Sequence, residues 1–360
     1  MSHFKAQCLP LLIGSLPSND HRQSVELIFE YTSQLPLWPQ LPVFREEGMI
    51  LQYLPGFPGI AEKDNKIYVD AKSEGFEAEL LAFYEEYLLV SEGAADINES
   101  RFILSEQSAR GFYEFLETAS RKKDGFLALK GQTTGPVTFC TALVDQDDRA
   151  IFYDDQLRDV AVKHLALKAR WQVAKMAEFC AKPIMFFDEP GLAGLGSSAF
   201  ITISDTDIVS SLSEVFEAVR AENGLTGVHV CANTEWPVIF DSGVDIVSFD
   251  AYSYFDKLIL YGEHLKKFFG RGGILAFGII PTNPEYIDIE SEEALVEKWY
   301  GQMEQLVALG IDRGMVAAQT LITPSCGTGT VSADQARRVL ELTRAVSERI
   351  REDFFPESNL

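Results

Sequence analysis

The sequence predicts a single (β/α)8 TIM barrel that spans residues 1–360. Eight short apolar segments have the length and composition of buried strands, and each precedes a stretch with helical spacing of its apolar residues. Such regular alternation is typical of a parallel barrel. The predicted strands begin at Leu9, Met49, Phe126, Pro183, Thr226, Ile246, Ile274 and Met315. An open doubly wound sheet is the alternative, but no glycine-rich dinucleotide motif follows the first strand.

The first strand–helix unit is followed by a long elaboration. We expect a strand at Leu9–Leu16, and Asp20 can cap a helix over 21–33. From 36 to 125, many prolines and glycines surround the second predicted strand, Met49–Tyr53, and predict loops on one rim of the barrel. This rim should also contain an extended segment and two helices, at 66–70, 77–90 and 105–121.

After residue 125 the alternation becomes regular. Strands are predicted at Phe126–Thr134, Pro183–Glu189, 226–232, Ile246–Asp250, Ile274–Ile280 and Met315–Ile322. Helices are predicted at 154–181, 206–222 with Asp205 as its N-cap, 236–241, 256–269, 292–309 and 333–350. We expect one domain, with residues 36–125 as its rim elaboration.

Composition excludes several kinds of protein. The chain is 46% hydrophobic and 24% charged, and no apolar run approaches the roughly 18 residues of a membrane span. A net charge of −23 disfavours nucleic acids and anionic membranes as partners. Five scattered cysteines, an odd number, suit a reducing compartment, so we expect a cytoplasmic protein.

Metal-seeking side chains follow several predicted strands. His229 and Cys231 are two apart in one strand and should therefore share a face. Asp250 ends the next strand, and Cys326 follows the last one. Because barrel strands end together at one face, these four groups can converge there. One imidazole, two thiolates and a carboxylate form a plausible tetrahedral zinc site.

Other polar groups end predicted strands at the same face. Ser15 follows the first strand, and Asp188 and Glu189 close an apolar one. Two acids are costly to bury without a role. We therefore expect a functional site there rather than a structural network.

Six motifs follow one another along most of the chain: Gly14-Ser15 with Pro17, Gly135-Pro136-Val137-Thr138, Asp188-Glu189-Pro190, His229-x-Cys231, the strand ending at Asp250, and Pro324-x-Cys326-Gly327. In this order they resemble the C-terminal catalytic barrel of cobalamin-independent methionine synthase, within the uroporphyrinogen-decarboxylase-like folds. The resemblance implies a zinc ion that binds the homocysteine thiolate and presents it to a methyl donor. It implies His229, Cys231 and Cys326 as ligands and as part of the catalytic centre. It also implies that Asp188 contacts the ammonium of the amino acid, with Glu189 beside it, and that Ser15 contacts the carboxylate.

The sequence departs from this family at one candidate metal ligand and at two features connected with the methyl donor. The family's carboxylate ligand is Glu, whereas Asp250 is one methylene shorter, so it is either a ligand drawn closer or an outer partner. The family also has an N-terminal barrel that helps to bind folate, and we expect no counterpart of that barrel in this chain. A histidine of the family, thought to assist proton delivery to folate, has no counterpart in 277–282. We therefore expect methylcobalamin or a methylated corrinoid protein as donor.

Several alternatives remain open. Methyltetrahydrofolate is the other donor, and coenzyme M, whose sulfonate needs a cation, is the other thiol acceptor. A decarboxylase resembling uroporphyrinogen decarboxylase would need strand-end arginines, which are absent from these motifs. A non-catalytic binding barrel would not need the ligand set.

Overall fold

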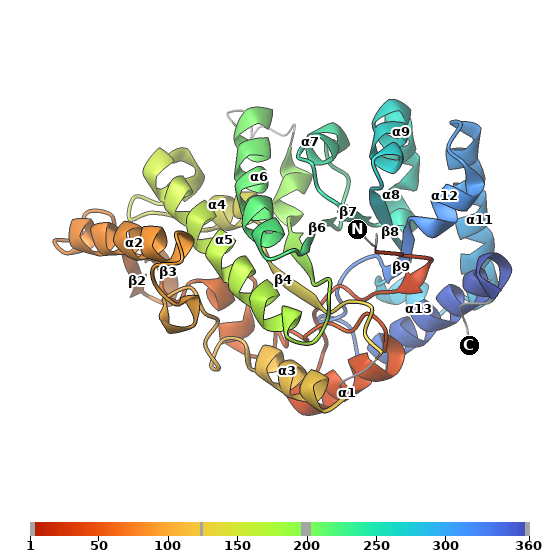
Figure 1. The fold of residues 1–360 in the computed structure, drawn as a ribbon, viewed down its shortest axis with the longest axis horizontal. Helices are drawn as coiled ribbons and strands as arrows, with labels where there is room; N and C mark the ends of the chain where they lie inside the picture. The colour runs from red at the N-terminus through yellow and green to blue at the C-terminus, as the bar shows by residue number, and fades with distance from the viewer. Residues whose placement is uncertain (1–3, 123–124, 196–202, 357–360) are drawn as a thin grey trace.

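The computed structural model describes residues 4–122, 125–195 and 203–356 and shows a curled sheet of seven parallel strands with helices on its outer face (Figure 1). The order across the sheet is β1-β9-β8-β7-β6-β5-β4. The strands are β1 (Leu9–Pro10), β4 (Lys130–Thr134), β5 (Ile184–Asp188), β6 (Leu225–Val230), β7 (Ile246–Phe249), β8 (Ile274–Ile280) and β9 (Thr320–Pro324). The chain therefore has an open, barrel-like α/β fold, with seven of the eight predicted strands represented in the sheet.

The second predicted strand is wrong. Residues Leu51–Tyr53 form a 3-10 helix, η2, and the place between β1 and β4 is taken by residues 36–40. Isolated parallel bridges join Leu37 to Lys130 and Gln40 to Ser15. Pro36 and Pro39 have no amide hydrogen, so a regular ladder cannot form along this segment. The sheet is consequently interrupted between β1 and β4, where the second predicted strand was expected.

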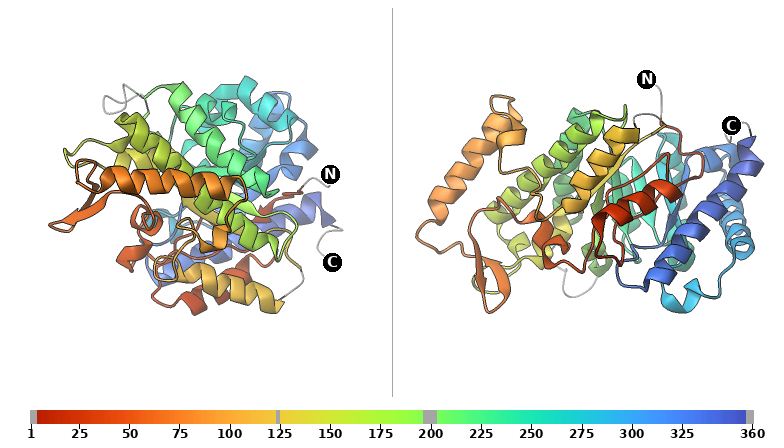
Figure 2. Two further views of the ribbon diagram at one scale, coloured as in Figure 1. Left: turned by 60° about the vertical axis from the view of Figure 1, so that its left-hand side comes forward. Right: turned by 90° about the horizontal axis from the view of Figure 1, so that it is seen from below.

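Most predicted helices are present. Figure 2 shows them around the sheet in two further views. The helices of the regular part are α1 (His21–Tyr31), α4 (Pro136–Ala142), α5 (Asp155–Ala177), α6 (Asp205–Ala221), α7 (Trp236–Asp241), α8 (Ala251–Leu258), α9 (Gly262–Gly270), α10 (Pro284–Ile287), α11 (Glu292–Ala308), α12 (Arg313–Ala318) and α13 (Ala333–Phe354). Short 3-10 turns lie at Ile151–Tyr153, Pro190–Gly194 and Ile259–Tyr261.

Three boundaries differ for local reasons. The predicted strand at Met315–Ile322 begins late, because Asp312 caps helix α12 by accepting the Met315 amide. Ser204, not Asp205, caps α6 through the Asp207 amide. The predicted helix over 256–269 is broken at Ile259–Tyr261 into α8 and α9. In contrast, Asp20 caps α1 as predicted.

The region 36–125 contains further short elements, and its assignment as a rim elaboration stays a prediction; residues 123 and 124 lie outside the described residues. It contains η1 (Arg45–Glu47), the hairpin β2 (Ile60–Lys63) and β3 (Lys66–Val69), α2 (Phe76–Ser91), η3 (Ile97–Glu99) and α3 (Arg110–Lys122). Asp64 and Asn65 turn the hairpin with positive φ angles of 52° and 62°. Figure 1 shows α2 at the left edge of the molecule, away from β9.

Alternation along the strands separates the interior from the helix layer. Ile184 and Phe186 of β5 belong to an interior cluster with Ile246 and Ala276, whereas Phe187 packs in the larger cluster that includes the helices. Successive side chains of a strand point to opposite faces. The residue two positions further along each strand, nearer its carboxyl end, therefore also faces the barrel interior. Among the described residues, no helix combines the length and low charge needed to cross a lipid bilayer.

Candidate metal centre

His229, Cys231 and Cys326 converge at the carboxyl end of the sheet, as expected from the sequence. Their ligand atoms all lie within 4.8 Å of one another. His229 is in β6, Cys231 follows that strand directly, and Cys326 follows β9. An imidazole and two thiols at this spacing can hold a zinc ion with a small contraction of the group.

Alternation along β6 directs the imidazole inward. Gly227 lies two residues before His229 and pairs with Phe186 of β5, while His229 pairs with Asp188. A Cβ at Gly227 would lie 2.7 Å from the Phe186 ring, so glycine is needed for that ring to fill the interior beneath the imidazole. The apolar layer below thus supports the candidate ligand above.

The imidazole has the form that a metal requires. His229 is 4% exposed, and its Nδ1 lies 2.9 Å from the Ser248 hydroxyl. Its Nε2 is buried and has no hydrogen-bond partner among the described residues. Burial, helped by the nearby Lys130 charge, lowers the pKa of His229 to about 3, so the ring is neutral. A neutral ring, oriented through one nitrogen and unsatisfied at the other, fits metal ligation.

The thiols of Cys231 and Cys326 are close enough to interact through a hydrogen bond. A hydrogen bond from Cys326 lowers the pKa of Cys231 to about 7, although burial acts in the opposite direction. The same hydrogen bond, together with burial, raises the pKa of Cys326. Cys231 is therefore the more easily ionised thiol of the two, and a bound cation would favour the thiolate form of both.

Ser15 holds the loop that carries Cys326. Its carbonyl accepts the amide and the hydroxyl of Thr328 at 3.0 and 3.1 Å, and its hydroxyl accepts the Gly329 amide at 3.2 Å. A Cβ at Gly327 would lie 2.2 Å from the Ser15 hydroxyl, so the loop passes directly over this serine. Ser15 thus positions the Cys326 loop, and its contact with a substrate carboxylate stays a prediction.

Asp188 lies at the end of β5, opposite His229 in the register. The side chain is 9% exposed, and its Oδ1 has no hydrogen-bond partner among the described residues. Burial raises its pKa to about 6, while the charge of Lys130 lowers it. A buried carboxylate oxygen without a donor beside the cysteine cluster suits a cationic group of a ligand.

Lys130 was missed in the sequence. Its Nζ donates to the Ile13 carbonyl at 2.5 Å and to the Gln132 side chain at 3.2 Å, and lies 4.8 Å from the centre of the Phe186 ring. Burial lowers the pKa of Lys130 to about 8, opposed by the Asp188 charge. The available signal was a lysine inside an apolar strand, two residues from Gln132. Ser248, which orients His229, was also missed in the sequence.

Glu189 is fully buried, and both of its oxygens are occupied. Oε1 accepts the Val137 amide at 2.9 Å, and Oε2 accepts the Thr138 amide at 2.7 Å and the Thr138 hydroxyl at 2.5 Å. Burial raises its pKa to about 7 against these hydrogen bonds. The contacts favour a role in fixing the start of α4 over direct contact with a substrate.

Asp250 lies at the end of β7 but outside the group of three candidate ligands. Its Oδ1 accepts the Ser253 amide at 2.8 Å and so caps α8. Its charge is nevertheless close enough to raise the pKa of Cys231. This arrangement favours an outer partner over a direct ligand, and ligation by Asp250 stays a prediction.

No protein-family model matches the chain, and no curated protein matches it in sequence. Solved structures do match. A methyltransferase from Methanosarcina mazei aligns with a TM-score of 0.53 at 15% identity, covering 93% of this chain and 85% of that one. A structure of the tandem GH20 catalytic modules of the pneumococcal exo-β-D-N-acetylglucosaminidase StrH aligns with a TM-score of 0.47 at 11% identity, covering 97% of this chain and 86% of that one. The chain therefore has the fold of the Methanosarcina methyltransferase, with a His/Cys/Cys cluster at the carboxyl end of its strands.

Proposed function

We propose that the protein is a zinc-dependent methyltransferase that moves a methyl group from methylcobalamin, or from a methylated corrinoid protein, to the thiol of homocysteine. The product is methionine. The observation that carries this proposal is the convergence of His229, Cys231 and Cys326 within 4.8 Å, with the histidine Nε2 buried and unsatisfied. The fold shared with a methyltransferase supports the same class of reaction.

These three residues would hold the zinc, with Ser248 fixing the tautomer of His229. Zinc held by these residues would supply Lewis acidity: it would lower the pKa of the substrate thiol, so that the thiol would be ionised at neutral pH. The thiol proton leaves to solvent before transfer. The sulfur–carbon bond then forms as the cobalt–carbon bond breaks, and the electron pair of that bond stays on cobalt.

The charges around the cluster favour an amino-acid thiol. Asp188 presents an unpaired carboxylate oxygen that can accept the ammonium of homocysteine. Coenzyme M is the second candidate, but its sulfonate would meet the same carboxylate. Lys130 is the buried cation nearby, and its ammonium is already directed at Ile13 and Gln132. Homocysteine is therefore the acceptor that we propose.

The proposed donor rests on the residues at the end of β8. Residues 277–282 contain no histidine, and the hydroxyl of Thr282 lies 3.0 Å from the Ser325 hydroxyl. Methyltetrahydrofolate has a poor leaving group that needs a proton in transfer. A corrinoid leaves without one, so we propose the corrinoid donor. Because the site depends on reduced thiols, we also propose that the protein works in the cytoplasm.

The test is methionine formation from homocysteine by zinc-loaded protein, with methylcobalamin or methyltetrahydrofolate as donor. We expect turnover with methylcobalamin and little or none with the folate. Cys326→Ser should be inactive, whereas Cys180→Ser, which changes a buried thiol that donates to the Met176 carbonyl, is the matched control and should stay active. Turnover with the folate alone would overturn the donor. Full activity of Cys326→Ser would overturn the metal mechanism.

A further inference from the structure

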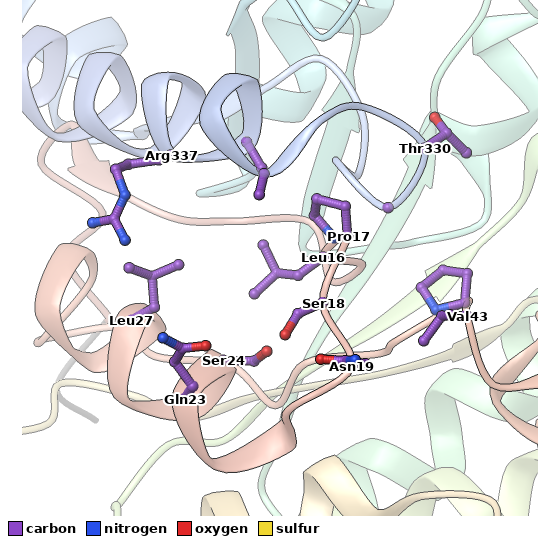
Figure 3. Close-up of a pocket in the computed structure, with 14 residues that line it drawn as sticks. Leu16, Pro17, Ser18, Asn19, Gln23, Ser24, Leu27, Val43, Thr330 and Arg337 are labelled. Carbon is purple, nitrogen blue, oxygen red and sulfur yellow. The ribbon is translucent and has the colours of Figure 1, made fainter.

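A cavity with a volume of about 860 Å³ lies outside the metal centre. It is bounded by the loop after β1, by α1 and by the start of α13. Figure 3 shows Arg337 extending from α13 toward Leu27 of α1, with Leu16 and Ser18 between the two helices. The volume is within the range of about 300 to 1,000 Å³ that is typical of small-molecule sites.

The cavity differs in charge from the rest of the protein. The chain has 54 acidic residues against 31 lysines and arginines, yet no acidic residue is among the described residues that line the cavity. Arg337 is the charged residue in this lining. Its neighbour Arg338 donates to the Glu290 carbonyl, whereas within the described chain Arg337 forms no hydrogen bond or ion pair. An unpaired guanidinium beside a cavity without carboxylates favours an anion.

The remaining lining is largely apolar. Leu16 is buried at the inner wall, Leu27 contributes from α1, and Val43 at the rim is 67% exposed. Covering such exposed apolar surface is favourable, so a ligand with a hydrocarbon portion gains from binding here. The side chains of Ser18 and Gln23 add hydrogen-bonding groups along the same wall.

We propose that this cavity binds a small organic anion with an apolar body, whose carboxylate, sulfonate or phosphate pairs with Arg337. A planar guanidinium can make two parallel hydrogen bonds to such a group. The site is distinct from the metal centre, because none of His229, Cys231 and Cys326 is among the described residues that line the cavity. The proposal does not depend on the methyltransferase reaction.

The experiment uses the full-length, zinc-loaded protein and the fluorescent probe 8-anilinonaphthalene-1-sulfonate. Octanoate, octylamine and octan-1-ol have the same chain length and differ in charge, so they serve as competitors. We expect octanoate to displace the probe and octylamine to fail. Arg337→Gln should weaken probe binding about 10-fold, through the loss of one charged contact. Arg338→Gln, the adjacent arginine outside the cavity, should change it by less than about twofold.

Two further variants separate this site from other places where the probe can bind. Ala333→Trp fills the cavity from an exposed position at the start of α13, so we expect loss of probe binding with an unchanged melting temperature. Cys326→Ser should leave probe binding intact. Equal effects of Arg337→Gln and Arg338→Gln, or equal displacement by octanoate and octylamine, would overturn the proposal. So would a loss of binding in Cys326→Ser alone.

Discussion

Asp250 shows how the contacts of one residue decide between two roles. Its carboxylate caps α8 and also lies near Cys231. Asparagine caps a helix about as well as aspartate, so Asp250→Asn keeps the cap and removes the charge. We expect an unchanged melting temperature and zinc binding that is weaker by about 10 to 100-fold, as for an outer partner. Competition with a chromophoric chelator measures the affinity.

Cys231→Ser is the reference for a lost ligand, since a neutral hydroxyl is a poor zinc ligand beside a thiolate. It should reduce zinc content to background, and Asp250→Glu, which restores the residue of the resembled family, should retain the metal. If Asp250→Asn loses as much zinc as Cys231→Ser, Asp250 is a direct ligand. If its affinity is unchanged, Asp250 has no part in the site.

Lys168 is a buried residue whose effect on the free energy of unfolding depends on pH. Its ammonium donates to the Ile103 carbonyl at 3.0 Å, and burial lowers its pKa to about 7. An unfolded lysine titrates near 10.4. Between about pH 7 and pH 10 the unfolded chain therefore binds this proton and the folded chain does not, so the free energy of unfolding rises with pH.

Lys168→Met removes the titrating ammonium and with it this pH dependence. We expect the variant to gain stability over the wild type near pH 7 and to lose this advantage toward pH 10. Urea denaturation of the zinc-free proteins at several pH values gives the difference. Lys175→Met, a more exposed position on the same helix, is the control and should follow the wild type. Parallel curves for Lys168→Met and wild type would contradict the expectation.

At the scale of elements, β8 was predictable because its apolar run is uninterrupted, and it agrees with the prediction at both ends. The segment that takes the place of the second strand, residues 36–40, was not predictable, because only its position between β1 and β4 gives it strand-like pairing. A segment with Pro36 and Pro39 lacks the local pattern of a strand, and only contacts with Ser15 and Lys130 reveal it.

The candidate site was predictable to the extent that it depends on strand alternation. His229 and Cys231 follow from their spacing, and Cys326 follows from its place after the last strand. Lys130 and Ser248 were missed because their roles come from partners elsewhere in the chain, the Ile13 carbonyl after β1 and His229 of β6. Spacing within one strand carries no information about such distant contacts.

Helix α4 depends on a buried carboxylate for its start. It has seven residues, and Glu189 accepts two of its first amides and the Thr138 hydroxyl. In Glu189→Gln an amide nitrogen would face donors that the second oxygen now accepts. We expect the free energy of unfolding to fall by about 1 to 3 kcal/mol, measured by urea denaturation.

The control for this change is Glu30→Gln, which removes the same charge from an exposed position on α1. It should leave stability within about 0.5 kcal/mol of the wild type. Zinc content should be unchanged in both variants, because Glu189 is not among the candidate ligands. Equal stability of the two variants would show that the Glu189 contacts do not stabilise α4.

At the scale of the whole molecule, the candidate ligands connect parts of the sheet that are not adjacent. His229 lies in β6 and Cys326 follows β9, and the strands β7 and β8 lie between them. A bound ion would therefore link the two strands across the mouth of the curled sheet. Ligand binding to the folded state alone stabilises it, by about 2.7 kcal/mol when the free ligand is 100 times its dissociation constant.

Removal of the metal should therefore lower the melting temperature by several degrees, and added Zn²⁺ should restore it. Mg²⁺ should not, because thiolate ligands select zinc over magnesium. Differential scanning calorimetry of zinc-loaded and chelator-treated protein measures the shift, with Cys326→Ser as the control in which zinc has no effect. If both forms of the wild type melt at the same temperature, or if zinc raises the melting temperature of Cys326→Ser equally, no ion links β6 to the Cys326 loop. A shift confined to the wild type would instead mean that the cluster contributes to the stability of the sheet as well as to its chemistry.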